Sequence, residues 1–275
     1  MEGKICLITG GSSGVGRATA KGLAEMGAVI VLVSRDEKKA QNTINELIAL
    51  TGNKKIFWMY ADLSLQSSIK EFVIRFKERY DRLHVLSNTA GLIQLNREET
   101  SEGIEKTLAV DYLSHFLISN LLKDLLQKSA PSRIITVAGG RRIIQNTKIN
   151  FNDIQFTKNY NGFKAAMQAA RARVIFSSEF ARRLQNTGVT CNAYQPGFIK
   201  TGMGNNFPQP LRFFSALLQP FLSDECKTSV YLASSDKAEG KTGLMFSKSK
   251  PVDFHYEPEE GRFLWEISKK LTGAG

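Results

Sequence analysis

The chain has 275 residues, of which 42% are hydrophobic, 9% aromatic and 23% charged. This composition is typical of globular proteins and excludes a disordered, collagenous or coiled-coil protein. The formal net charge is +11, but the basic doublets are dispersed and no aromatic residues are interleaved with them, so nucleic acid is not an expected partner. A phosphorylated cofactor, or an acidic protein such as an acyl carrier, explains the charge better.

Two further features bound the cellular context. No apolar run approaches the roughly 20 residues that a membrane-spanning helix needs, and the first apolar stretch is too short for a signal peptide. The three cysteines, Cys6, Cys191 and Cys226, are too few and too scattered for a disulfide framework or a zinc site. The sequence therefore predicts no transmembrane segment, no metal and a reducing, cytoplasmic location.

Short runs rich in β-branched residues alternate with longer helical patterns along the whole chain. The predicted strands are 4–9, 28–33, 55–60, 83–88, 133–138 and 189–194. The predicted helices lie near 15–26, 37–50, 66–79, 100–127, 163–185, 224–234 and 258–271. Such an alternation predicts an α/β fold with a parallel sheet covered on both faces, doubly wound by right-handed crossovers. Because no linker or repeat interrupts the chain, a single Rossmann-type domain is expected over residues 1–275.

One segment departs from this alternation. Residues 205–222 follow the sixth predicted strand and combine three prolines with many apolar side chains. Ligands of such sheets bind beyond the carboxyl ends of the strands, so we expect this segment to be a lid over an apolar ligand. A buried helix and a membrane-surface patch are the alternative interpretations.

The first predicted strand runs into a glycine-rich loop, TGGSSGVG at residues 9–16, and a helix follows. Glycines allow a tight turn against a pyrophosphate, and the helix N-terminus supplies free N–H groups and the positive end of its dipole. After the second strand, Arg35 suits the 2′-phosphate of NADP, whereas an acidic residue would suit NAD; a simple surface position is the alternative. Asp62 is expected either to accept a hydrogen bond from adenine or to start the next helix.

These features together resemble the short-chain dehydrogenase/reductase superfamily, and within it the retinol-dehydrogenase-like branch of NADP-dependent carbonyl reductases. The resemblance covers essentially the whole chain: the glycine-rich loop, SRD at 34–36, ADL at 61–63, NTAG at 88–91, PGFIKTGM at 196–203 and the tail motifs at 228–235, 250–252 and 264–273. It implies an NADP cofactor held by the following residues: Gly10, Ser12, Ser13, Gly14, Val15, Gly16, Arg35, Asp62, Leu63, Asn88, Ala90, Gly91, Pro196, Gly197, Ile199 and Thr201.

The catalytic part of the family pattern differs. The family uses a tyrosine as proton donor, a lysine four residues later, a serine after the fifth strand and an asparagine in the fourth helix. In the register of Pro196, the tyrosine and lysine positions fall on Ala166 and Ala170, and the other two fall on Gly139 and Asp111. The resemblance therefore implies an intact cofactor loop beside a lost catalytic set.

Tyr160 and Lys164 match the family's YxxxK spacing, but they lie six residues too early. A six-residue shift along a helix moves a side chain by about 9 Å and rotates it by roughly 240°. We therefore interpret this match as coincidental. A local insertion, for which Gly162 leaves room, would be needed to bring the two side chains to the nicotinamide.

Other polar side chains lie near the vacated positions. Arg173 shares the helix face of Ala166 and Ala170 and is interpreted as a packing residue or a member of a surface ion pair; the alternative is that it reaches the vacated space and pairs with Asp111. Three more arginines are close in sequence, namely Arg141, Arg142 and Arg171. The histidines, His84, His115 and His255, are interpreted as structural.

Three functions stay open at this point. The first is non-redox chemistry (cyclisation, elimination or isomerisation) on an apolar small molecule, free or carrier-bound, with NADP bound weakly or without reacting. The second is a non-catalytic pseudoenzyme that acts as a binding module. The third is an NADP-dependent carbonyl oxidoreductase that uses Tyr160 and Lys164. Relatives form oligomers through the long helices predicted at 100–127 and 163–185, so a homodimer is an option that the sequence leaves open.

Overall fold

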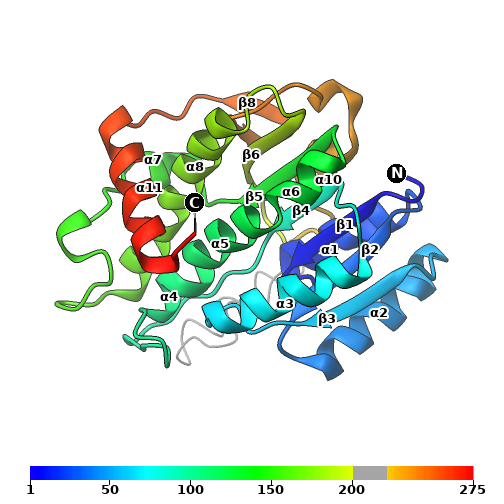
Figure 1. Ribbon diagram of the computed structural model, residues 1–275, viewed down its shortest axis with the longest axis horizontal. Helices are drawn as coiled ribbons and strands as arrows, with labels where there is room; N and C mark the ends of the chain where they lie inside the picture. Colours follow the sequence, from blue (N-terminus) through cyan, green and yellow to red (C-terminus); the bar gives the residue numbers. More distant parts are fainter. Residues whose placement is uncertain (201–221, 275) are drawn as a thin grey trace.

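The computed structural model describes residues 1–200 and 222–274. In these residues an eight-stranded sheet runs through the molecule in the order β3-β2-β1-β4-β5-β6-β7-β8, with helices on both faces (Figure 1). The strands are β1 (Ile5–Thr9), β2 (Val29–Ser34), β3 (Ile56–Tyr60), β4 (Val85–Asn88), β5 (Ser132–Val137), β6 (Val189–Gln195), β7 (Met245–Ser247) and β8 (Lys250–Val252). Only β7 and β8 pair antiparallel. The predicted doubly wound α/β fold is confirmed.

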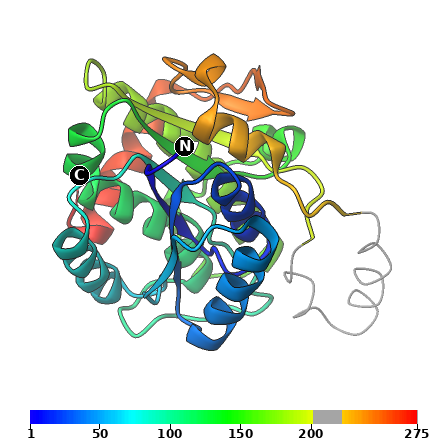
Figure 2. The same ribbon diagram turned by 90° about the vertical axis from the view of Figure 1, so that its right-hand side faces the viewer.

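The helices form two layers around this sheet. They are α1 (Gly14–Ala24), α2 (Glu37–Thr51), α3 (Gln66–Arg79), α4 (Lys106–Leu108), α5 (Ser114–Leu121), α6 (Lys123–Lys128), α7 (Arg141–Asn146), α8 (Gly162–Arg183), α10 (Lys227–Ser234) and α11 (Pro258–Thr272). Figure 2 shows α1 and α2 on one side of the sheet and α5 and α11 on the other. Within the described residues, no helix combines the length and apolarity that crossing a bilayer requires.

The core follows from the strand period of two. Along β2, Val31 and Val33 pack toward α3, α5 and α8, whereas Ile30 and Leu32 pack toward α1 and α2. Both sets are fully buried. A strand that is buried on both faces must be apolar at every position, which is why these strands appear in the sequence as continuous apolar runs.

The helical stretch predicted near 100–127 is confirmed from Lys106 onward and is wrong at its start. Residues before Lys106 form a turn closed by a bridge between Glu99 and Glu105, and the helix begins only at α4. The Glu105 carboxylate accepts the N–H groups of Thr107 and Leu108, which caps the helix at this point. One π-helical turn, η1 (Ala109–Leu113), then separates α4 from α5, and α6 is a further separate helix.

The sheet order places the ligand crevice. From β1 the chain winds outward through β2 to β3, and from β4 it winds in the opposite direction through β5 and β6. The strand order therefore reverses between β1 and β4. In open parallel sheets, ligands bind outside the carboxyl ends of the strands at this reversal.

Candidate functional site: the crevice at the ends of β1 and β4

The loop between β1 and α1 packs directly against the end of β4. Gly10 has a φ of +64°, and a Cβ there would lie 2.9 Å from the Cα of Ala90. At Gly16, a Cβ would lie 2.5 Å from the Gly10 carbonyl oxygen. Only glycine fits both positions, so the predicted role of these residues in a close backbone approach agrees with the geometry.

The N-terminus of α1 is open toward the crevice. Its N-cap residue, Ser13, makes no side-chain hydrogen bond to the first turn, and that turn holds no acidic residue. The backbone N–H groups of Gly14, Val15 and Gly16 therefore remain available for an anion. This uncapped terminus, together with the glycine cradle, fits the pyrophosphate of a dinucleotide.

The ends of β1 and β4 are clamped by a side chain that sequence reasoning missed. The Thr9 hydroxyl accepts the backbone N–H groups of Thr89 and Ala90 at 3.0 and 3.3 Å. The side-chain nitrogen of Asn88 donates to the Ser119 hydroxyl on α5 at 3.0 Å. Its amide therefore supports the helix layer. In the sequence, the only indication of the Thr9 clamp was the position of Thr9 at the start of the glycine-rich loop.

The adenine side of the crevice holds two predicted residues after β2 and β3. Arg35 is exposed, and among the described residues its guanidinium has no hydrogen-bond or ion-pair partner. Asp62 accepts the backbone N–H and the hydroxyl of Ser64 through one oxygen, at 2.9 and 2.7 Å. This contact closes a local turn, and Asp62 does not cap the next helix, because α3 begins at Gln66 with Leu65 as its N-cap. Within the described residues, the second carboxylate oxygen of Asp62 makes no hydrogen bond and is left for a ligand. Leu63 is buried behind it.

The segment after β6 carries the remaining predicted cofactor residues. Pro196 and Gly197 follow the strand, and Gly197 has a φ of +83°. Ile199 is buried and forms a bridge with Ser223. Thr201 lies outside the described residues, as does all but the last residue of the segment predicted to be a lid.

Three of the positions that the resemblance assigns to the family's catalytic set lie at the end of β5 and on α8. Gly139 follows β5, and a Cβ there would lie 3.7 Å from the Cβ of Ala170 and 3.4 Å from Ile144. Ala166 lies one turn before Ala170 on α8, and both are buried. The side chains that these three positions contribute are therefore two methyl groups and a hydrogen.

The fourth position, Asp111, lies in the π-helical turn η1 and is paired. Its Oδ1 accepts the backbone N–H of Leu92 at 2.8 Å, and its Oδ2 lies 3.7 Å from Nη2 of Arg173 on α8. Of the two interpretations of Arg173, the structure supports the pairing with Asp111. Burial raises the pKa of Asp111 to about 7, against the opposing effects of the Arg173 cation and the Leu92 N–H.

The pair lies behind the loop that follows β4. A Cβ at Gly91 would lie 3.5 Å from Oδ2 of Asp111 and 3.7 Å from Nη1 of Arg173. His115 on α5 contacts the Ala90 carbonyl oxygen through Nε2 at 3.0 Å. Burial, and then the Arg173 cation, lower the pKa of His115 to about 3. A neutral, buried histidine that holds the backbone agrees with the predicted structural role.

Tyr160 and Lys164 do not form a donor pair. Asn161 caps α8 through its side chain, so the helix begins after Tyr160. The Tyr160 hydroxyl donates to the Gln94 carbonyl oxygen at 2.9 Å and to the Glu105 carboxylate at 3.1 Å. Burial raises its pKa to about 12, while Lys164 is exposed. These contacts agree with the interpretation that the YxxxK match is coincidental.

The other arginines near the vacated positions hold the C-terminal segment. Arg171 forms two parallel hydrogen bonds of 2.7 Å with Glu260 on α11. Arg141 donates to the Asp253 carbonyl oxygen, and Arg142 is exposed. Among these neighbours, Arg173 alone contacts Asp111.

Comparisons with known proteins identify the family of this chain. The family model for short chain dehydrogenases matches residues 4–211. Retinol dehydrogenase 14 of Homo sapiens is 33% identical, over 99% of this chain and 87% of its own length. Polyprenol dehydrogenase of Homo sapiens is 30% identical, over 98% of this chain and 85% of its own length. The chain therefore belongs to the short chain dehydrogenase family.

Solved structures share the fold. The RhlG/NADP active-site complex of Pseudomonas aeruginosa aligns with a TM-score of 0.69 at 25% identity, covering 90% of this chain and 95% of that chain. A short chain dehydrogenase from Shigella flexneri aligns with a TM-score of 0.69 at 19% identity, covering 94% of this chain and 95% of that chain.

Proposed function

We propose that this protein binds NADP(H) in the crevice but does not carry out ordinary carbonyl reduction, and that it uses the altered crevice for non-redox chemistry on an apolar substrate, free or carrier-bound. Cyclisation, elimination and isomerisation are the candidate reactions. The observation that carries the proposal is the presence of Gly139, Ala166 and Ala170, three positions without a transferable proton, in a chain whose phosphate loop is intact.

The cofactor half of the proposal rests on three features. Gly10 and Gly16 allow a pyrophosphate to approach the backbone closely. No side chain caps the first turn of α1. Arg35 is free to pair with a 2′-phosphate. When bound, NADPH supplies a hydride. The relative RhlG is described in complex with NADP, which supports the same choice for this chain.

The catalytic half rests on the cost of losing a proton donor. A positioned general acid contributes typically 10²- to 10⁴-fold to a rate. Tyr160 is not a substitute, because its hydroxyl is already bound to Glu105 and its pKa is raised. Asp111 is a buried carboxyl whose pKa is raised to about 7, so near neutral pH it can gain or lose a proton.

The choice of an apolar substrate follows the relatives. Their names specify retinol and polyprenol, both long apolar alcohols. We extend that class of ligand, but not the redox reaction, to this chain. The alternative of a redox enzyme that uses Tyr160 and Lys164 is the outcome that the experiment below must exclude.

The test measures binding and turnover separately. NADPH fluorescence titration is expected to show binding, which Arg35→Ala weakens about 10- to 100-fold for NADPH while leaving NADH unaffected, as expected for loss of hydrogen bonds to a charged group. Absorbance at 340 nm is expected to show no oxidation of NADPH with long-chain aldehydes such as retinal. Steady oxidation that Tyr160→Phe abolishes would overturn the proposal.

A second experiment separates an enzyme from a binding module. If the protein acts without NADPH consumption, incubation with apolar alcohols, epoxides and polyenes followed by mass spectrometry is expected to reveal a rearranged product of unchanged redox state. Asp111→Asn is expected to slow its formation. A protein that retains every candidate ligand unchanged is instead a pseudoenzyme.

A further inference from the structure

We propose that Asp111 and Arg173 together bind the two neighbouring hydroxyls of the ribose next to the nicotinamide. This assignment rests on the proposed binding of NADP(H). It gives the buried pair a ligand of defined chemistry, a neutral vicinal diol, and makes Arg173 a cofactor-binding residue of this chain.

The first argument is that the N–H donors of Arg173 make no hydrogen bond within the described residues, although its charge is paired with Asp111. In the part of the chain that the structure describes, its guanidinium makes no hydrogen bond, and its Nε is fully buried without a partner. The approach of Nη2 to Asp111, at 3.7 Å, is longer than a hydrogen bond. A guanidinium has five N–H donors, and leaving them unpaired in a side chain that is only 8% exposed is costly. A ligand that brings oxygen acceptors removes this cost.

The second argument is the position of the pair. The loop after β4 lies against the loop after β1, since Gly10 is packed on Ala90. A dinucleotide whose pyrophosphate lies at the start of α1 continues across the strand-order reversal, over the end of β4 and toward β5. Gly91 is the residue at this end of β4 that borders both Asp111 and Arg173, and it has no side chain to cover them.

The third argument decides the chemistry of the ligand. Oδ1 of Asp111 is already bound to the Leu92 N–H, which leaves Oδ2 to accept a hydrogen bond, while Arg173 can only donate. A hydroxyl both donates and accepts, so two adjacent hydroxyls satisfy an acceptor and a donor side by side. A phosphate or carboxylate would be repelled by Asp111, and the net charge of the ionised pair is zero.

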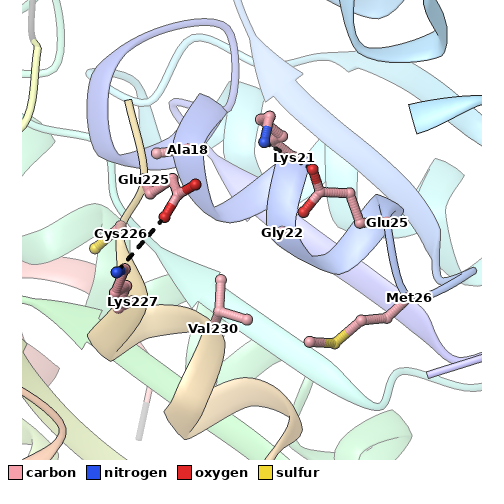
Figure 3. A pocket seen from close by; sticks show the side chains of 9 residues that line it. All are labelled: Ala18, Lys21, Gly22, Glu25, Met26, Glu225, Cys226, Lys227 and Val230. Atoms are coloured by element: carbon pink, nitrogen blue, oxygen red, sulfur yellow. Dashed lines mark hydrogen bonds and ion pairs between the residues drawn. The ribbon is translucent and has the colours of Figure 1, made fainter. Parts of the chain in front are cut away.

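A cavity elsewhere in the protein offers a comparison with Arg173, because its charged side chains are paired. The space between α1 and α10 has a volume of about 240 Å³, with Met26 and Val230 among its lining residues (Figure 3). Its charged side chains pair with one another, Lys21 with Glu25 at 2.7 Å and Glu225 with Lys227 at 4.0 Å. None of the side chains that line it has a buried polar atom without a partner, so this cavity does not call for a ligand in the same way.

The experiment compares two ligands by isothermal titration calorimetry. NADPH carries the nicotinamide ribose, whereas adenosine 2′,5′-bisphosphate lacks it but still contains the groups that the Arg35 side of the crevice would bind. Arg173→Gln is expected to raise the Kd for NADPH about 10- to 100-fold and to leave the Kd for the bisphosphate within about twofold. The matched control is Arg171→Gln on the same helix, which removes a buried cation that faces α11 and leaves both Kd values unchanged.

Gly91→Ala provides a test that does not remove a buried charge. The backbone of Gly91 is not left-handed, and the added methyl would meet the pair only at ordinary contact distances, so the fold is expected to persist. The methyl would cover the pair, and a selective loss of NADPH affinity of at least threefold is expected.

The outcomes separate the inference from the proposed function. If both variants leave the Kd for NADPH unchanged, the inference is wrong and the proposed function stands. If both ligands weaken equally, the pair is structural and the inference is also wrong. If the unmodified protein binds neither ligand, the proposed function itself fails.

Discussion

Glycine is favoured at Gly10, in the loop after β1, and at Gly52, at the end of α2, for different physical reasons. Gly10 and Gly52 both have a positive φ, +64° and +71°, but only Gly10 is also surrounded: a Cβ at Gly52 would meet nothing within 4 Å. The two positions therefore separate backbone strain from steric exclusion. Gly52 ends α2 in the left-handed conformation, where any residue other than glycine is strained.

This contrast predicts unequal effects of the same substitution. Gly52→Ala should cost about 1 kcal/mol of folding free energy, the price of a left-handed alanine. Gly10→Ala should cost clearly more and abolish NADPH binding, because its methyl would also meet the Cα of Ala90. Urea denaturation and fluorescence titration measure the two effects. Equal stability losses with binding retained would show that the loop can move away from β4.

The sequence identified many residues of this crevice but not their hydrogen-bond state. The glycines, Arg35 and Asp111 were found because their signals are local: a loop between a strand and a helix, or a position in a motif. That Arg173 lacks hydrogen bonds, or that Asn88 turns to Ser119, depends on which helices pack over the sheet. No local pattern carries that information.

Among the elements, α11 has the clearest structural role. Trp265 packs on Phe116, Phe176 and Phe180 with ring centroids 5.0 to 6.3 Å away, and the Arg183 guanidinium lies 3.7 Å from the centre of its ring. The helix thus covers part of α5 and α8. Residues 114–119 of α5 are all buried in the single chain.

The packing of α11 predicts a large effect of one substitution. Trp265→Ala should cost about 3–5 kcal/mol, because it empties a buried aromatic cluster. Phe263→Ala on the same helix is the matched control: Phe263 is 60% exposed, so its loss should cost less than about 1 kcal/mol. Chemical denaturation measures both values. Similar costs for the two would mean that α11 is only loosely attached.

The sequence pattern did not predict two features of the elements: the short strands β7 and β8, and the start of a helix at Lys106. β1 to β6 were found because each is an apolar run, but β7 and β8 have three residues each and carry no period. The helix predicted from residue 100 begins at Lys106 because Glu105 caps it, and the same carboxylate accepts the Tyr160 hydroxyl. The residue that caps this helix is thus also in contact with a segment about 55 residues away.

The stability of the whole molecule should depend on pH through His115. Its pKa is lowered to about 3 in the folded protein by burial and by Arg173, and it is about 6.5 in an unfolded chain. The unfolded state therefore binds a proton between these values that the folded state does not. The stabilisation from His115 is complete above pH 6.5 and is lost as the pH falls, by at most about 1.4 kcal/mol per pH unit.

Comparison with His115→Gln isolates this effect. The raised pKa of Asp111 acts in the opposite direction in the same range, since its carboxyl is protonated more readily when folded, but it is present in both proteins. The stability advantage of the original protein over the variant should shrink as the pH is lowered from 7 to 5, measured by urea unfolding. A constant difference would show that the pKa of His115 is the same in the folded and unfolded states.

The sequence by itself predicted the doubly wound sheet and the glycine-rich loop after β1, since each strand, each helix and the loop has a pattern carried by residues close together in the chain. The tertiary structure decided that Asp111 on η1 meets Arg173 on α8, that Tyr160 is bound by Glu105, and that α11 covers α5 and α8. The physical reason is burial. Once water is removed, a polar or charged group needs a partner, and that partner comes from segments that only folding brings together.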